Sequence, residues 1–207
     1  MRISRMLVAG VAATTVLTVS VAGCGGKKTP SPTSTTKSAS STSATSSPGP
    51  ASPAPAQPSD YTGLLIQATD IDAPVQFKGS PPVNNPNGQP GVATTFSTED
   101  NSHVIKDTIQ VLADPAAATN ALSAAKGEQK TAIKNPQPGS ANVGTGATTL
   151  SGNKLDGSKG VLILLFTEGK AFVTLEFDGP TDSLPPEDFV NDVGGKQAAA
   201  VKKGLGG

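Results

Sequence analysis

Hydrophobic and polar residues divide the chain into three zones with different patterns. Residues 6–22 are rich in Val, Leu and Ala and carry no charge, whereas residues 25–59 contain no Val, Ile, Leu or aromatic residue. From residue 60 onward, apolar residues return at the spacings expected of strands and helices. The pattern therefore predicts one folded domain over residues 60–207, preceded by a polar segment and an apolar N-terminal segment.

Five segments of this domain have the period-two alternation or the short apolar run that predicts a β-strand. They are residues 91–98, 104–113, 146–151, 160–166 and 170–177. In the second segment, Ile105, Ile109 and Val111 share one face, which Asp107 interrupts. The fourth, GVLILLF, is apolar throughout, so we expect a central strand covered on both faces, joined to the fifth by a tight hairpin.

Three helices are predicted around these strands. The first is short, over residues 61–71, and the last follows residues 182–186 and continues to Val201, with Gly194 and Gly195 as a point where it could split. The middle helix is expected over residues 115–134, with Asp114 as its N-cap. Its predicted buried side consists of Ala118, Leu122, Ala125, Gln129 and Ile133.

The predicted order of elements is α-β-β-α-β-β-β-α. Consecutive strands are expected to pair as hairpins, which predicts an α+β domain with a single antiparallel sheet of about five strands and helices packed on one face. Residues 73–90, 99–103 and 135–144 are crowded with turn-forming residues and are predicted to be loops.

The N-terminal segment has the pattern of a signal peptide. Arg2 and Arg5 precede the apolar stretch, and small residues follow at Ala22 and Gly23. The motif VAGC, residues 21–24, resembles the lipobox of bacterial lipoproteins, including those of mycobacteria and other actinobacteria. The resemblance implies cleavage between Gly23 and Cys24, and conversion of Cys24 to an S-diacylglycerol and N-acyl cysteine. The alternative is a free cysteine in an uncleaved transmembrane anchor.

Cys24 is the only cysteine of the chain, so residues 60–207 can form no disulfide and offer no thiolate nucleophile. Residues 1–23 are therefore predicted to be a signal peptide, residues 24–59 a lipidated cysteine and its stalk, and residues 60–207 the folded domain. Ser, Thr, Pro and Ala occupy 28 of the 35 positions from 25 to 59, a composition that predicts disorder and suits O-glycosylation. Such a stalk has a root-mean-square span of roughly 30–35 Å.

The charge of the folded domain argues against nucleic acid as a partner. Its 11 lysines and 16 acidic residues give a net charge of −5, without a basic cluster. Phosphate neutralisation needs a positive patch. With no Trp and an aromatic content of 3%, the chain also lacks the platforms that carbohydrate sites and strong protein interfaces use.

Candidate catalytic and metal sites are few. His103, the only histidine, lies beside Glu99 and Asp100, which could be imagined as metal ligands, but loop solvation explains the segment better. Neither a G-x-S-x-G motif nor a complete phosphate loop is present, since residues 144–149 lack the later glycine and the lysine of such loops. The acids of residues 178–188 are expected at a helix start rather than as a catalytic pair. We therefore predict no catalytic residue, metal or cofactor.

A second resemblance covers residues 61–203. The stretches LLIQATDID and IQVLADPAAATNAL, together with the order of elements, resemble mycobacterial lipoproteins and the extracytoplasmic sensor domains of PknH-type serine/threonine kinases. Those sensor domains are disulfide-bonded, whereas this domain has no cysteine, so no site residue is carried over.

These patterns predict a non-enzymatic lipoprotein of the cell envelope, held by Cys24 at the extracytoplasmic face of the membrane, whose domain binds or senses a ligand or an envelope protein. One alternative is a carrier of a lipid or another hydrophobic ligand, with VLILLF lining a cavity instead of packing in the core. The other is a hydrolase that uses His103.

Overall fold

The computed structural model describes residues 60–206. The predicted signal peptide, Cys24 and the predicted stalk lie outside the described residues. Residues 60–206 belong to one compact unit, and every buried hydrophobic residue of the described part lies between Tyr61 and Val201. Because this unit contains its own core, we expect it to fold by itself. Within the described residues, no helix is both long and apolar enough to cross a lipid bilayer.

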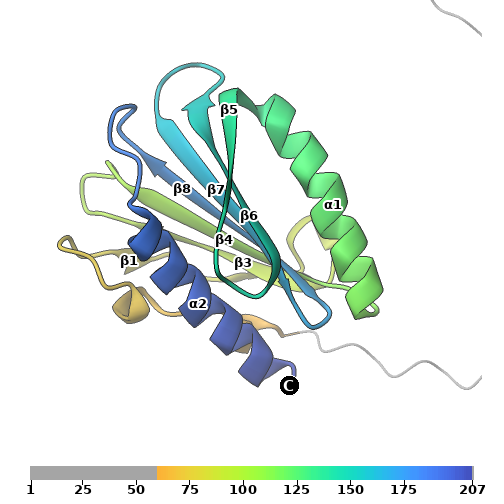
Figure 1. Ribbon diagram of the computed structural model, residues 1–207. Coiled ribbons are helices and arrows are strands. Elements are labelled where there is room, and N and C mark those ends of the chain that lie inside the picture. Colours follow the sequence, from red (N-terminus) through yellow and green to blue (C-terminus); the bar gives the residue numbers. More distant parts are fainter. Residues whose placement is uncertain (1–59, 207) are drawn as a thin grey trace, which may run out of the picture. The chain divides into compact units, whose positions relative to one another are not determined.

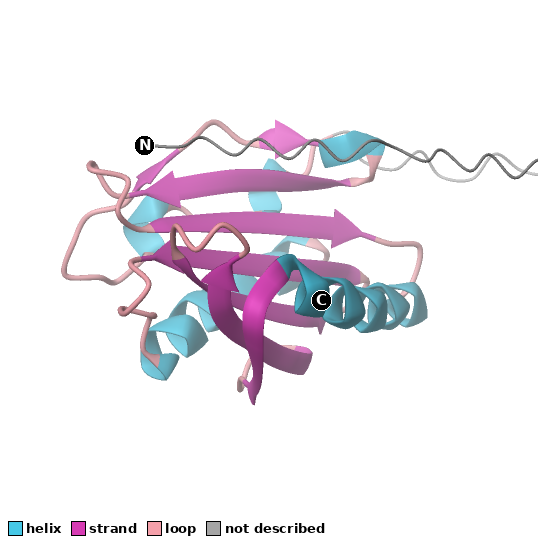
Figure 2. Cartoon of the chain, turned by 90° about the horizontal axis from the view of Figure 1, so that it is seen from above, coloured by secondary structure: helices cyan, strands magenta, loops and turns pink. Residues whose placement is uncertain are grey.

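The centre of the domain is one antiparallel sheet (Figures 1 and 2). Its strands are β1 (Lys78–Gly79), β2 (Val83–Asn84), β3 (Gly91–Ser97), β4 (Val104–Val111), β5 (Ile133–Ser140), β6 (Thr145–Lys154), β7 (Gly160–Glu168) and β8 (Ala171–Gly179). They are arranged in the order β1-β3-β4-β8-β7-β6-β5, and β2 also pairs with β3. The antiparallel sheet is confirmed, but the number of about five strands is wrong, since the sheet has eight.

The three additional strands lie in segments that were predicted to be loops, except that β5 begins at Ile133, which was predicted to lie on the buried side of the middle helix. β1 and β2 are each two residues long and pair with β3, within the turn-rich residues 73–90. β5 lies at the end of the sheet and pairs with β6, with a register shift between Lys134 and Gln137. Pro136 and Pro138 made this segment look like a loop, but an edge strand tolerates proline because its outer N–H groups need no partner.

The predicted helix over residues 61–71 is also wrong. The segment contains two 3₁₀ turns, η1 (Thr62–Leu64) and η2 (Ala68–Asp70), with extended backbone at Leu65 between them. The buried side chain of Gln197 explains the interruption, because its Oε1 accepts a hydrogen bond from the Ile66 N–H at 3.1 Å, and its amide donates to the Leu64 carbonyl at 2.7 Å. A distant glutamine thus replaces the hydrogen bonds of a continuous helix.

The two long helices agree well with the sequence pattern. Helix α1 (Pro115–Ala132) begins after Asp114, whose side chain accepts a hydrogen bond from the Ala117 N–H at 2.8 Å and so confirms the predicted N-cap. Helix α2 (Glu187–Gly204) is continuous through Gly194 and Gly195. Gly194 is buried against Leu164, so this glycine allows close packing on the sheet instead of splitting the helix.

The helices cover opposite faces of the sheet, which corrects the prediction that they share one face. Along β7, Leu162, Leu164 and Phe166 belong to the core that contains the buried residues of α2. The alternate residues Val161, Ile163 and Leu165 belong to the core under α1. Because successive residues of a strand point to opposite faces, α1 and α2 must lie on different sides. The apolar run VLILLF is therefore covered on both faces, as predicted.

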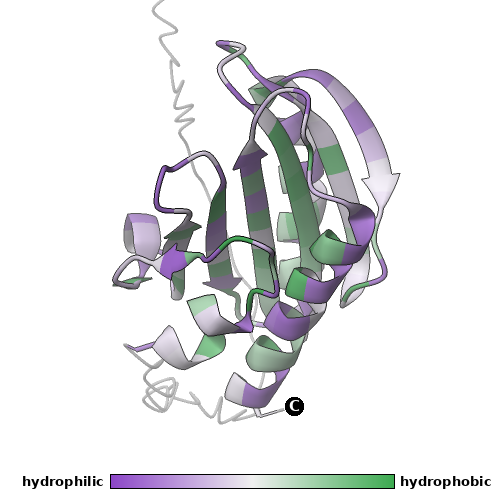
Figure 3. Ribbon diagram, turned by 90° about the vertical axis from the view of Figure 1, so that its left-hand side faces the viewer, coloured by the Kyte–Doolittle hydropathy of each residue, from purple (hydrophilic) through white to green (hydrophobic). Residues whose placement is uncertain are grey.

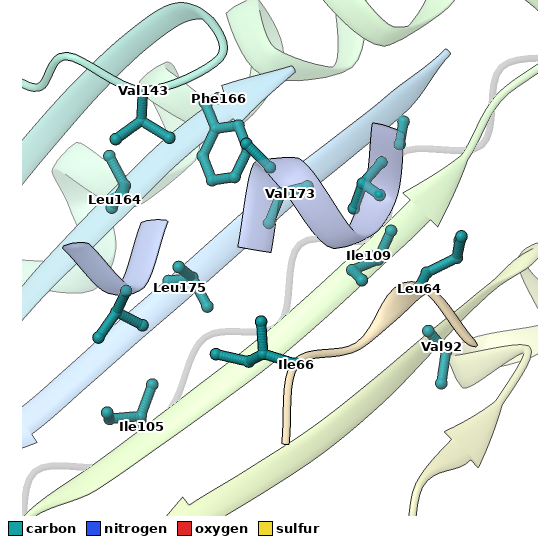
Figure 4. Packing of buried hydrophobic residues seen from close by; sticks show 14 of the residues in the cluster. Leu64, Ile66, Val92, Ile105, Ile109, Val143, Leu164, Phe166, Val173 and Leu175 are labelled. Atoms are coloured by element: carbon teal, nitrogen blue, oxygen red, sulfur yellow. The ribbon is translucent and has the colours of Figure 1, made fainter. Parts of the chain in front are cut away.

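The core under α2 is the larger of the two. Figure 4 shows side chains of β3, β4, β7 and β8 meeting those of the N-terminal segment beneath this helix, among them Val92, Ile109, Val173 and Leu64. Figure 3 shows the same arrangement by hydropathy, with apolar residues along the strands that the helix covers. We call this side the α2 face and the other side the α1 face.

Candidate functional site

A cavity of about 620 Å³ opens on the α2 face, at the N-terminal end of α2. The loop over residues 72–77, the neighbouring ends of β4 and β8, and residues 183–192 enclose it. These three parts are far apart in the sequence. The volume lies within the range of roughly 300–1,000 Å³ that is usual for small-molecule sites.

The inner wall of the cavity is apolar and belongs to the core. Ile105 of β4 and Phe177 of β8 are buried cross-strand partners, and both line the cavity. Phe189 of α2 packs edge-on against Phe177, with ring centroids 6.0 Å apart and an interplanar angle of 71°. Since aromatic pairs of this kind stabilise packing, the wall is held in place by the same contacts that hold α2 on the sheet.

The mouth of the cavity exposes two large hydrophobic side chains. Val75 is 48% exposed and Leu184 is 39% exposed, and both line the cavity. The described residues contain two other exposed large hydrophobics, Val83 and Leu155, which do not line it. An apolar ligand would cover Val75 and Leu184 and thereby remove apolar surface from water.

The Asp, Glu, Lys and Arg residues that line the cavity are all acidic. Asp72, Asp178, Asp188 and Asp192 are among its lining residues, which include no lysine or arginine. The nearby Lys196 is already paired with Asp192, at 2.7 Å between Nζ and Oδ2. Asp188 and Glu187 lie in the first turn of α2, where they complement the positive end of the helix dipole, as predicted for this acidic segment.

The cavity lies at the end of α2 that is distant from the start of the domain. A methyl group added at Gly204, the last residue of α2, would lie 3.3 Å from the Gly63 carbonyl oxygen, which places the first described residues beside the C-terminal end of this helix. The 18 residues of α2 correspond to a length of about 27 Å. The entrance therefore lies near the opposite end of α2 from residue 60.

His103 lies at the edge of the cavity, half-buried, at the end of the predicted hairpin loop. Its two predicted acidic neighbours have other partners. Asp100 accepts hydrogen bonds from the Ser102 N–H, the Thr98 hydroxyl and the Ser102 hydroxyl, and these bonds lower the pKa of its carboxyl to about 2. Glu99 forms an ion pair with Lys78. Among residues 60–206, no group of three His, Asp or Glu side chains is placed to hold a metal ion.

A serine does lie beside the histidine. The Ser102 hydroxyl is 3.0 Å from His103 Nδ1, and it also donates to Asp100 Oδ1 at 2.8 Å. In a hydrolase triad the acid orients the histidine, whereas here Asp100 binds the serine and the backbone of its own turn. The arrangement stabilises the loop, and its hydrogen bonds do not reproduce the order of groups that nucleophilic catalysis requires.

The other segments considered for chemistry have structural roles. Residues 145–149 belong to β6 and are followed by more strand, so they lack the helix N-terminus that a phosphate loop needs. The apolar residues 161–166 of β7 pack in the two cores and do not line the cavity. This agrees with the expected packing of the run in the core, and the alternative in which it lines a ligand cavity is wrong for this cavity.

The sequence analysis did not predict that two aspartates, Asp107 and Asp178, would be buried. Asp107 is fully buried on β4, and neither of its carboxylate oxygens has a hydrogen-bond partner among the described residues. Its cross-strand neighbours are Thr94 and Leu175, and burial raises its pKa to about 8. Its place within an alternating apolar strand was the available signal, because that position faces the core.

Asp178 of β8 is also buried, but it is paired. Lys154 Nζ lies 2.6 Å from its Oδ2, and Lys106 Nζ lies 3.4 Å from the same oxygen. Glu176 joins both lysines to complete a network of four charged side chains. These side chains come from β4, β6 and β8, so the network depends on strand pairing.

The comparisons with known proteins concern the fold. No family model matches the chain, and no curated protein matches it. Among solved structures, the extracellular domain of PknH from Mycobacterium tuberculosis is similar, with a TM-score of 0.51 and 9% sequence identity, over 71% of this chain and 95% of that chain. At this identity the similarity establishes a shared fold only, and at that level it supports the predicted resemblance to PknH-type sensor domains.

Proposed function

We propose that this protein is a non-enzymatic binding module, held by Cys24 at the extracytoplasmic face of a membrane, whose ligand places an apolar group in the cavity at the N-terminal end of α2. The observation that carries the proposal is the cavity itself, whose apolar wall continues to the exposed Val75 and Leu184. The proposal covers both the predicted binding module and the alternative of a carrier for a hydrophobic ligand, because the same cavity would hold the ligand in either case.

The position of the cavity is compatible with attachment through the N-terminal side of the domain. Its entrance lies at the far end of α2 from residue 60, so this attachment would leave the entrance free for a ligand. Two or three acyl chains on one cysteine suffice for stable anchoring, because each buried CH₂ contributes about 0.8 kcal/mol.

The binding part of the proposal can be tested with an uncharged apolar probe. Residues 52–207, labelled with ¹⁵N, would be titrated with 1-octanol and followed by NMR. We expect shifts of the amide signals of Leu184, Phe189 and Val104, because these residues line the cavity. Shifts spread over the whole surface, or no shifts at concentrations up to the solubility of octanol, would contradict the proposal.

A pair of variants makes this test specific. Val75→Asp combined with Leu184→Asp places two charges at the mouth and should reduce octanol binding at least tenfold, since burying an unpaired charge is unfavourable. Val83→Asp is the matched control, because Val83 is 58% exposed and does not line the cavity. The control should bind octanol as the parent domain does. Native mass spectrometry of protein isolated from the organism that encodes it would then identify the natural ligand.

The anchoring part needs its own test. In cells supplied with radioactive palmitate, the full chain should be labelled and should fractionate with the membrane, whereas Cys24→Ser should be unlabelled and released. A labelled Cys24→Ser variant would show that the acyl group is attached elsewhere. An unlabelled parent chain would overturn the anchor without affecting the cavity.

A further inference from the structure

The charges around the cavity give information about the ligand beyond its apolar part. We infer that the ligand is a small amphipathic cation, with an apolar body that enters the cavity and an amine or another positively charged group that remains at the mouth. This inference rests on the proposed function, since it specifies the ligand of the same cavity.

The charged residues lining the cavity are acidic. The carboxylates of Asp72, Asp188 and Asp192 are available to the cavity, whereas that of Asp178 points to the α1 face, and no lysine or arginine lines the cavity. His103 is the only lining side chain that could carry a positive charge. A cationic group at the mouth would therefore meet carboxylates on several sides, whereas a carboxylate or phosphate group would meet repulsion.

Two of the lining aspartates, Asp72 and Asp188, have no ion pair within the described domain. Asp178 is bound by Lys154 and Lys106, and Asp192 is bound by Lys196. Asp188 has neither a hydrogen bond nor an ion pair through its side chain in the described structure, and Asp72 has only a longer-range interaction with Lys196. Asp72 and Asp188 come from two different walls of the cavity, and both are exposed.

The N-terminal end of α2 is not available as an anion site, because acidic side chains occupy its first turn. The N-terminal end of α2 points toward the cavity and would favour an anion through its dipole and free N–H groups. Glu187 and Asp188 occupy its first turn and supply that negative charge themselves. An anionic ligand would have to compete with both carboxylates, so the helix end gives it no advantage.

The test compares three probes that share an eight-carbon chain. Octylammonium, 1-octanol and octanoate would be titrated into ¹⁵N-labelled residues 52–207 at low ionic strength, with the amides of Leu184 and Phe189 as reporters. Exposed ion pairs are individually weak, so we expect octylammonium to bind about tenfold more tightly than octanoate, with octanol between them. The difference should decrease as salt is added, because exposed charges are screened.

A charge-removal variant checks the cause. Asp72→Asn combined with Asp188→Asn should reduce the ratio between octylammonium and octanoate to about twofold and leave octanol binding unchanged. The matched control, Glu128→Gln combined with Glu168→Gln, removes the same number of negative charges from residues outside the cavity lining and should keep the tenfold ratio.

The outcomes separate this inference from the proposed function. If all three probes bind at the cavity with equal affinity, or octanoate binds most tightly, the cationic ligand is excluded and the apolar site stands. If the control variant lowers the ratio as much as Asp72→Asn with Asp188→Asn does, the preference comes from net charge and the inference is also wrong. If none of the probes shifts the reporter signals, the apolar site itself is absent.

Discussion

The two faces of the sheet bury an aspartate in opposite ways. On the α2 face, Asp107 lies in the larger core without any partner for its carboxylate oxygens, and burial raises its pKa to about 8. On the α1 face, the side chain of Asp178 is 4% exposed and is bound by two lysines. The comparison shows two solutions for a buried acid, because one is kept neutral by protonation and the other is neutralised by ion pairing.

The surroundings of the two aspartates differ because the core under α2 is larger than the core under α1. The α2 face contains 21 of the clustered buried hydrophobic residues and the α1 face contains 8, so only the first surrounds its acid with apolar groups. Beyond the area that α1 covers, the lysines of the network stay partly exposed, with 44% of the Lys106 side chain and 30% of the Lys154 side chain accessible. Long cationic side chains can reach an acid there and keep their charged ends in water.

The largest expected effect concerns Asp107 and pH. The unfolded carboxyl ionises near pH 3.9, whereas the folded one stays protonated until about pH 8. Between these values the unfolded state binds fewer protons, so the free energy of unfolding should fall by about 1.4 kcal/mol per pH unit, on the order of 5 kcal/mol in total. This stabilising contribution is complete below pH 4 and is lost as the pH rises through 8.

Urea unfolding of residues 52–207 from pH 4 to pH 8 would measure this slope. Asp107→Asn cannot titrate and should lack it, whereas Glu128→Gln, at an exposed position on α1, should retain it. Parallel profiles for the parent domain and Asp107→Asn would mean that Asp107 has a charged or hydrogen-bonded state in solution, and the contrast between the faces would disappear.

The next effect concerns the ion pairs of the α1 face. Lys154→Met leaves Asp178 with Lys106 alone, at 3.4 Å, and should lower the free energy of unfolding by about 2–3 kcal/mol. Adding Asp178→Asn should recover part of this loss, since no buried charge would remain unpaired. Chemical denaturation of the single and double variants gives the coupling.

The matched control for this network is the exposed pair of α2. Lys196→Met breaks the ion pair with Asp192, which joins residues one helical turn apart, and should cost no more than about 0.5 kcal/mol. Equal losses for Lys154→Met and Lys196→Met would show that the burial of Asp178 contributes little.

A smaller effect tests the packing of α2 itself. A methyl group added at Gly194 would lie 2.7 Å from Leu164 Cδ2 and 3.1 Å from Val143 Cγ2, whereas one added at Gly195 meets nothing within 4 Å. Both alanine variants gain helix propensity, so Gly194→Ala should be less stable than Gly195→Ala by about 1–3 kcal/mol. Thermal unfolding measures the difference, and equal melting temperatures would indicate that α2 packs loosely.

The smallest effect concerns the start of α1. Asp114→Ala removes the hydrogen bond to the Ala117 N–H and should lower the free energy of unfolding by about 1 kcal/mol. Asp114→Asn keeps an accepting oxygen and should be nearly neutral. A loss in Asp114→Asn equal to that in Asp114→Ala would assign the effect to charge instead of the cap.

Local patterns were sufficient where neighbouring residues decide the structure. Asp114 before Pro115 marked the start of α1, and the alternation of residues 170–177 marked β8. The predictions of secondary structure were wrong where a residue far away in the sequence determines the local backbone conformation. Residues 61–71 have a helical pattern, but Gln197 binds the backbone at Leu64 and Ile66. Residues 135–144 are rich in turn formers, but residues 137–140 pair with β6. The candidate site was missed for the same reason, because loops 72–77 and 183–186 meet only in the folded chain.

The sequence by itself determined the folded region, most of its strands, both long helices and the need to cover residues 160–166 on two sides. These features depend on the period of apolar residues and on capping, which act over a few positions. Only the tertiary structure decided that α1 and α2 lie on opposite faces, that Asp107 is unpaired while Asp178 is bound by lysines, and that a cavity opens at the end of α2. Each of these depends on contacts between residues far apart in the chain, which the local pattern does not contain.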